Sequence, residues 1–210
     1  ALFIVATPAL NRIVEWNEAM HLPEALYNIE QWMRQQENAA TKITEQILQV
    51  NSFSHFLAVI FGIGILTGIG EEMIFRGVLQ RIVQDKNHRA HVAVWICAFL
   101  FSAIHLQFYG FIPRLLLGAF FGYLLVWSKN LWLPIFAHLF NNSTVACISY
   151  FTNDKSPDNL IETVGTSGSP TSWLAGASLI GTVILLYVLY KKVFVSKSKE
   201  FFPMEDKITP

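Results

Sequence analysis

Two adjacent carboxylates and a guanidinium stand where an uncharged run of this sequence ends. Residues 70–77 read GEEMIFRG and follow the run SFSHFLAVIFGIGILTGIG of residues 52–70. Glu72 and Arg76 are four residues apart, so they share one face of a helix and can form an ion pair. The 3.6-residue helical period turns Glu71 about 100° away from Glu72. We therefore expect Glu72 to be tied to Arg76 and Glu71 to be free for chemistry.

Two further uncharged runs carry imidazole and amide groups. His105 lies in one of them, and His138, Asn141 and Asn142 lie in the other. His138 and Asn142 share a helix face because they are four residues apart, whereas Asn141 points elsewhere. Ionisable groups inside a membrane are costly and persist mainly where they pair, line a cavity or do chemistry. We expect these groups to converge with the two glutamates on one buried polar chamber.

A carboxylate, two imidazoles and an amide in a partly dry chamber suffice for peptide hydrolysis. Glu71 could act as the general base that takes a proton from water. His105 could hold that water beside the carboxylate. His138 and Asn142 could donate hydrogen bonds to the carbonyl oxygen of the substrate as it becomes an oxyanion, a charge that preorganised donors stabilise. A hydrolase built in this way needs no cofactor.

The same side chains also suit a divalent metal ion such as zinc. Glu71, His105 and His138 would supply three ligands and leave a fourth position for water. The helical metalloprotease signature HExxH does not occur in the sequence. On residue types alone, the metal-dependent and the metal-free mechanisms stay equally open.

The elements that must position these residues are predicted to be membrane-spanning helices. The 210 residues are 53% hydrophobic and only 14% charged, whereas soluble domains carry about 25% charged residues. The mean hydropathy of +0.41 agrees with a membrane protein. The third of five uncharged stretches reaches the ~20 residues of a spanning helix only if residues 111–114 belong to it. The predicted fold is an all-α, polytopic transmembrane helix bundle with five spanning helices, at residues 52–70, 90–113, 115–128, 130–153 and 163–190.

Residues 1–51 are predicted to lie outside this bundle. The opening ALFIVATPAL reads as the end of an earlier span that a truncation has cut. Residues 22–48 carry apolar side chains near helical spacing, which indicates an amphipathic outer helical segment. We expect the catalytic helix bundle to occupy residues 52–195 and a cytoplasmic tail to occupy residues 196–210.

Charge placement gives the five spans an orientation. Cytoplasmic loops of membrane proteins are enriched in Lys and Arg. Equal numbers of basic and acidic residues, 15 of each, give no indication of a nucleic-acid partner. We expect a bacterial inner-membrane protein with a cytoplasmic C-terminus, whose partners are the lipid bilayer and a peptide or protein at the membrane. With the first span entering from outside, the basic residues on the cytoplasmic side are Arg81, Lys86, Arg89, Lys129, Lys191, Lys192, Lys197 and Lys199.

Three stretches of the sequence resemble the successive motifs of one family. EEMIFRG, FSAIH (residues 101–105) and HLFNN (residues 138–142) are similar to the motifs EExxxR, FxxxH and HxxxN of the CAAX prenyl protease and bacteriocin-processing family. Members of this family are intramembrane endopeptidases of the type II CAAX class. The resemblance covers residues 70–142 in order and in residue type. It implies a protease that cleaves a membrane-associated peptide or protein.

The resemblance also assigns a role to each polar residue. The family has long been labelled metalloprotease, yet its better-understood members look like glutamate-dependent enzymes, which favours the metal-free mechanism. The roles that the resemblance implies are the water-activating base for Glu71, completion of the first motif for Glu72 and Arg76, water orientation for His105, and oxyanion stabilisation for His138 and Asn142.

A second class of function uses the same residues without catalysis. Glu72 and Arg76 could clamp two helices together, and His138 with Asn142 could form hydrogen bonds between helices. The chain would then be a non-catalytic membrane scaffold, or a transporter in which the polar cluster lines an ion path. The joint occurrence of three motifs in the order of the family favours the protease.

Overall fold

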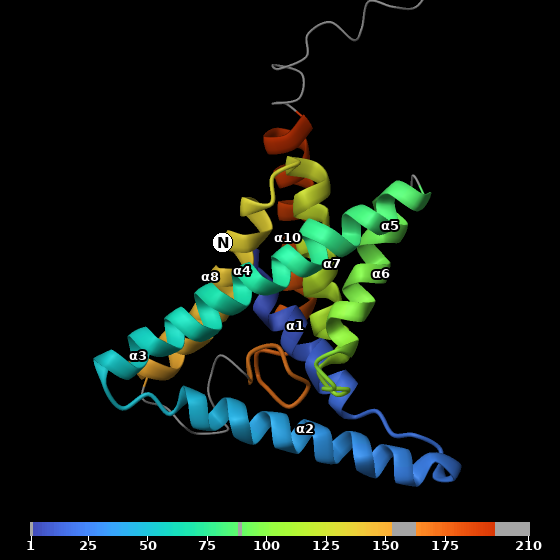
Figure 1. Cartoon of the computed structure of the whole chain (residues 1–210). Coiled ribbons are helices and arrows are strands. Elements are labelled where there is room, and N and C mark those ends of the chain that lie inside the picture. The colour runs from blue at the N-terminus through green and yellow to red at the C-terminus, as the bar shows by residue number, and fades with distance from the viewer. Residues whose placement is uncertain (1, 88–89, 153–162, 196–210) are drawn as a thin grey trace, which may run out of the picture. The chain divides into compact units, whose positions relative to one another are not determined.

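The computed structural model describes residues 2–87, 90–152 and 163–195, most of them in helices (Figure 1). No β-strand occurs in these ranges, which confirms the predicted all-α class. The predicted tail, residues 196–210, lies outside the described residues. The chain divides into two compact units, one formed by Ala1–Arg12 with Thr163–Pro210 and the other by Ile13–Glu162.

The first unit pairs the two ends of the chain. It contains the start of helix α1 (Leu2–Glu18), helix α10 (Leu174–Val188) and the π-helical segment η4 (Leu189–Val195). The Ser178 hydroxyl donates to the carbonyl of Val5 at 2.5 Å and accepts the N–H of Ala9 at 3.1 Å. One buried serine thus holds α1 against α10.

The second unit is built on one long helix that runs from Phe53 to Gln84 and onward to Asn87. It begins where the Ser52 side chain accepts the N–H of His55. The predicted first span therefore continues beyond Gly70, and the two glutamates lie inside the helix rather than at its end. Its successive segments are α3 (Phe53–Val59), η2 (Ile60–Leu66), α4 (Thr67–Glu72), η3 (Met73–Leu79) and α5 (Gln80–Asn87), of which η2 and η3 are π-helical.

Three more helices complete the bundle of this unit: α6 (Ala90–Ala103), α7 (Phe111–Ser128) and α8 (Trp132–Thr152). The first residues of α7 confirm that the short third stretch reaches spanning length. α6 is apolar but has only 14 residues, and α8 is long enough but carries a histidine and two asparagines in its middle. In the described ranges, the helices long and apolar enough to cross a membrane are Phe53–Gln84, Phe111–Ser128 and Leu174–Lys191.

The predicted second span, residues 90–113, is wrong at its C-terminal end. The helix stops at Ala103 and a turn leads to α7. Leu106 has a φ of 53°, in the left-handed region that a right-handed helix excludes. Pro113 contributes to this break because a proline is tolerated in the first turn of a helix but not in its interior. His105 therefore lies in the turn after α6 and not on the helix.

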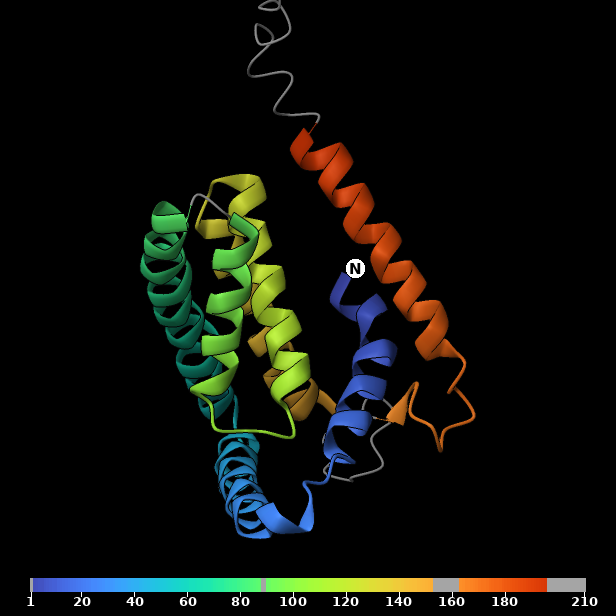
Figure 2. The same cartoon turned by 90° about the vertical axis from the view of Figure 1, so that its right-hand side faces the viewer.

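The predicted amphipathic segment is helical. A short 3₁₀ turn, η1 (Glu24–Leu26), leads into α2 (Tyr27–Leu48). Figures 1 and 2 show α2 lying across the end of the bundle at which α6 stops and α7 begins. The helix therefore lies beside the turn that carries His105.

Glycines allow the helices of the second unit to approach closely. Gly64 and Gly68, and likewise Gly118 and Gly122, are four residues apart, the small-xxx-small spacing that permits close helix packing. A Cβ atom at Gly68 would come within 3.2 Å of the backbone nitrogen of Leu139 on α8. A Cβ atom at Gly118 would lie 3.3 Å from the Cα of Ala98 and 3.1 Å from the Phe101 ring. These two positions set the spacing of α8 against α4 and of α7 against α6.

We expect Gly118→Ala to destabilise the protein by about 1–3 kcal/mol, because the added methyl group overpacks the contact between α6 and α7. Gly176→Ala is the matched control, since a Cβ atom there meets no heavy atom within 4 Å. It should leave the stability unchanged or raise it by up to about 1 kcal/mol. Thermal unfolding of both variants in one detergent measures the difference, and equal melting temperatures would contradict the packing described here.

Candidate active site

Glu72 and Arg76 form the buried ion pair that their spacing predicts. Arg76 Nη1 donates to Glu72 Oε1 at 2.9 Å, and neither side chain is exposed to solvent. The second Arg76 nitrogen, Nη2, donates to the backbone carbonyl of Gly118 at 2.7 Å. The guanidinium also lies 4.8 Å from the centre of the Phe101 ring. The pair therefore joins the long helix to α6 and α7.

Gln80 extends this pair by one more helical turn. Its Nε2 donates to the carbonyl of Gly122 at 3.2 Å, and the residue is 1% exposed. Glutamate, arginine and glutamine thus follow one another at four-residue intervals and meet α7 at two glycines four residues apart. Sequence reasoning missed Gln80, although its distance of four residues from Arg76 was a usable signal.

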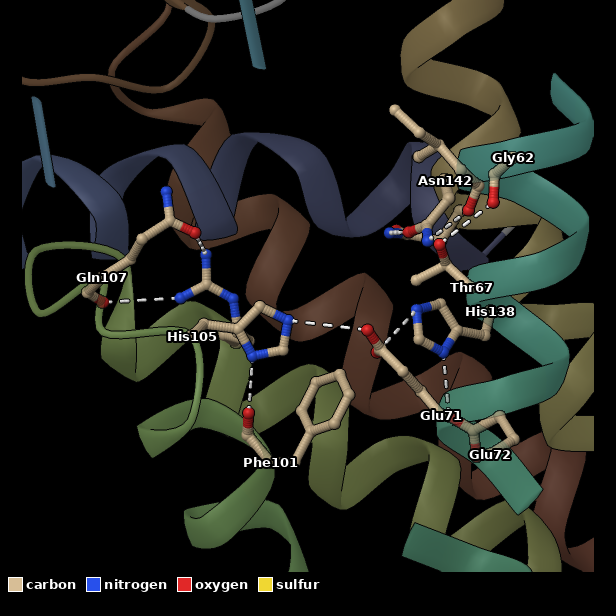
Figure 3. A network of polar contacts seen from close by, with 12 residues as sticks. Gly62, Thr67, Glu71, Glu72, Phe101, His105, Gln107, His138 and Asn142 are labelled. Atoms are coloured by element: carbon tan, nitrogen blue, oxygen red, sulfur yellow. Dashed lines mark hydrogen bonds and ion pairs between the residues drawn. The ribbon is translucent and has the colours of Figure 1, made fainter. Parts of the chain in front are cut away.

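His138 is fixed by the ion pair and by an aromatic ring. Its Nδ1 lies 2.9 Å from Glu72 Oε1 (Figure 3). Its ring stacks on Phe121 with centroids 4.9 Å apart. An ionised carboxylate only accepts hydrogen bonds, so Nδ1 carries the proton in this contact. The other ring nitrogen, Nε2, faces Glu71.

His105 is oriented by its own segment. Its Nδ1 lies 2.7 Å from the carbonyl oxygen of Phe101, and the Phe101 ring packs edge-on against it at 5.1 Å. A carbonyl is only an acceptor, so Nδ1 donates and the Nε2 of the neutral ring has a free lone pair. Figure 3 shows this Nε2 directed toward Glu71.

Glu71 lies between the two imidazoles. Its Oε1 is 3.9 Å from His105 Nε2 and its Oε2 is 3.8 Å from His138 Nε2. The Glu71 side chain is 24% exposed, whereas that of Glu72 is fully buried. Adjacent carboxylates therefore have different surroundings, as the helical period predicts. Glu72 is used in structure, and Glu71 faces accessible space.

Asn142 lies one turn beyond His138 on α8 and is bonded to the long helix. Its Nδ2 donates to the carbonyl of Ile63 at 3.2 Å, and its Oδ1 accepts from Asn141 at 3.3 Å. Ile63 belongs to the π-helical segment η2, in which the Thr67 hydroxyl also donates to a backbone carbonyl. The contacts of Asn142 thus fix the segment before Glu71, and one hydrogen of its amide group is left for another acceptor.

The three candidate metal ligands do not form a ligand set in this geometry. The two imidazole nitrogens face different oxygens of Glu71 at 3.8 and 3.9 Å. Within the described ranges, no group of three or more His, Cys, Asp or Glu side chains is arranged to hold a metal ion. We therefore derive no step through a metal.

The apolar helices and their buried polar cluster define a helical membrane protein. Residues 53–144 match the sequence model of the type II CAAX prenyl endopeptidase Rce1-like family, which confirms the resemblance carried by the three motifs. This segment contains the long helix, α6, α7 and the site residues of α8. The similarity to that family is confined to this segment, which is less than half of the chain.

One curated relative is also similar in sequence. The chain is 29% identical over 109 residues to the uncharacterised protein YpbD of Bacillus subtilis strain 168. The aligned region covers 50% of this chain and 51% of that relative, so the chain matches about half of the relative's length. No solved structure matches the chain significantly.

We expect Arg76→Met to destabilise the protein by about 3–5 kcal/mol, because it leaves the Glu72 carboxylate buried without its cation. The double variant Glu72→Gln with Arg76→Met should recover most of this loss, since the buried charge is removed and the glutamine oxygen still accepts from His138. Thermal or denaturant unfolding in detergent measures both changes. A double variant as unstable as the single one would show that the charge balance does not control stability.

Proposed function

We propose that the chain is the catalytic part of an intramembrane endopeptidase that hydrolyses a peptide bond in a membrane-associated peptide or protein. The observation that carries this proposal is the position of the Glu71 carboxylate, less than 4 Å from the Nε2 atoms of His105 and His138. The match of residues 53–144 to the type II CAAX prenyl endopeptidase family supports it.

Glu71 and His105 can hold the attacking water between them. Their facing atoms, 3.9 Å apart, are too distant for a direct hydrogen bond. A water about 2.8 Å from each atom, a normal hydrogen-bond length, would lie beside the line that joins them. Both atoms act as acceptors, so such a water would donate one hydrogen to each and direct a lone pair outward. Glu71 would then take the proton as the water attacks.

His138 and Asn142 would stabilise the oxyanion on the same side of α8. Asn142 keeps one amide hydrogen beyond its bond to Ile63. The Nδ1–H of His138 donates a hydrogen bond to Glu72, so His138 can also donate from Nε2 only when both ring nitrogens are protonated. The buried Glu72 and Arg76 would serve this step by fixing the imidazole, which makes them positioning residues.

The matched family and the charge pattern of the sequence support a proposal for the substrate and the location. The name of the matched family points to peptides with a prenylated C-terminal motif, and the class as a whole points to peptides presented at the membrane. Basic residues near the ends of the long helix and of α10 support a cytoplasmic C-terminus, because cytoplasmic segments are enriched in Lys and Arg. We propose a bacterial inner membrane as the site of action.

The decisive variant is Glu71→Gln, assayed with internally quenched peptides, with and without a farnesylated cysteine, presented in phospholipid vesicles. It should lower kcat by at least about 100-fold, because an amide cannot take the proton from water. Its melting temperature should match that of the parent, since Glu71 is partly exposed. Glu45→Gln on α2 is the control and should cleave at the parental rate.

Two other outcomes would overturn this function. Cleavage by Glu71→Gln at the parental rate would remove the proposed base. Failure of the parent to cleave either set of peptides, together with loss of assembly or of ion transport in Glu71→Gln, would establish the scaffold or transporter instead.

We expect a chelator to leave cleavage unchanged, because the proposed reaction uses only side chains of the chain. The parent is assayed with the same vesicles after incubation with EDTA and with 1,10-phenanthroline, and its melting temperature is recorded in parallel. Loss of cleavage that zinc restores would replace the metal-free mechanism by the metal-dependent one.

A further inference from the structure

The turn between α6 and α7, residues 104–110, carries His105, to which no side chain of another helix is hydrogen-bonded within the described ranges. The His105 side chain is 27% exposed, and its hydrogen bond goes to Phe101 in the preceding helical turn. His138, in contrast, is 4% exposed and is held by Glu72 from another helix. The distance from His105 to Glu71 therefore depends on where the backbone of this turn lies.

Asn17, near the end of α1, holds that backbone at two points. Its Nδ2 donates to the carbonyl of Phe108 at 3.1 Å, and its Oδ1 accepts the N–H of Ile112 at 2.9 Å. Ile112 lies in the first turn of α7, whose cap residue Gly110 has no side chain to offer. A helix N-terminus needs such an acceptor for its free N–H groups. Asn17, which is 3% exposed, supplies it from a distant part of the chain.

Helix α2 also contacts this turn. Glu37 Oε2 accepts the backbone N–H of Tyr109 at 3.0 Å. The Trp32 ring packs against Phe108 with centroids 5.4 Å apart, and the Arg34 guanidinium lies 4.3 Å from the centre of the Tyr109 ring. Polar and aromatic contacts from one helix thus meet two successive residues of the turn.

The segment that carries Asn17 and helix α2 are themselves linked by hydrogen bonds. Glu30 on α2 accepts from Arg34 at 2.7 Å and from the backbone N–H of Leu22, in the segment that follows α1, at 2.8 Å. The Arg34 guanidinium, with the Leu22 N–H and His21, lowers the pKa of Glu30 to about 2, so this tie persists at neutral pH. Asn17 and Glu37 are therefore held in a fixed relation to each other.

We propose that Asn17 and Glu37 are positioning residues that set the distance between His105 and Glu71, an inference that rests on the function proposed above. Their hydrogen bonds go to backbone groups of the turn and of the first turn of α7, and not to reacting atoms. A displacement of the reacting groups by about 1 Å can lower a rate by about 100-fold.

The kinetic test compares Asn17→Ala and Glu37→Ala with the parent on a quenched peptide that the parent cleaves. Each should lower kcat by roughly 10- to 100-fold and change KM by less than about threefold, because the water and not the peptide is misplaced. Glu37→Gln, which keeps an acceptor oxygen, should restore most of the rate. Glu45→Gln, on the exposed part of α2, should behave as the parent.

A double-mutant cycle separates positioning from general destabilisation. In a His105→Gln background, Asn17→Ala should have little further effect on kcat, because the residue through which it acts is already lost. An equal fold loss in both backgrounds would overturn the proposal.

A spectroscopic test needs no turnover. The ¹³Cε1 signal of His105 in histidine-labelled protein, assigned by its loss in His105→Gln, should shift in Asn17→Ala and Glu37→Ala and stay in place in Glu45→Gln. An unmoved signal would contradict the proposal even if Glu71 proves essential. A shifted signal together with an active Glu71→Gln would instead leave the positioning intact and overturn the catalytic role of Glu71.

Discussion

One buried ion pair determines how several helices of this bundle pack against each other. Glu72 and Arg76 are taken completely out of solvent, so each must be neutralised and hydrogen-bonded by what surrounds it. The carbonyl of Gly118 on α7 accepts a hydrogen bond from Arg76, and the imidazole of His138 on α8 donates one to Glu72. Glu72 is buried in this ion pair, whereas its neighbour Glu71 is not part of it and is partly exposed. The chemistry proposed for the site depends on this difference between two adjacent carboxylates.

The pattern of the sequence predicted the parts of the site that lie on regular helices. Glu72 and Arg76 pair as their spacing indicates, and His138 and Asn142 lie on one face of α8. The contact of α7 with Arg76 could not be predicted in the same way, because α7 accepts the hydrogen bond through the backbone carbonyl of Gly118. A backbone carbonyl has no residue type to recognise, so an approach that searches for polar side chains passes over it.

The errors of the sequence analysis occurred where local backbone geometry departs from the regular helix. His105 was predicted on a span that runs to Pro113, but Leu106 adopts a left-handed conformation that no apolar pattern reveals. Asn142 was predicted to line the same polar chamber as Glu71, and its hydrogen bonds with Asn141 and with Ile63 on the π-helical segment are contacts that the sequence did not predict. Such π turns occur often at functional sites. Two of them flank Glu71, on a helix that the sequence alone presents as uniform.

The cap that Asn17 supplies to α7 has a consequence for how relatives of this chain should be compared. In this chain the acceptor for the first turn of α7 comes from Asn17, which lies outside all three motifs. The presence of the three motifs and the correct placement of their side chains are then separate properties. If Asn17 positions His105 as proposed, two chains with identical motifs can differ in rate because of a stretch that no motif includes.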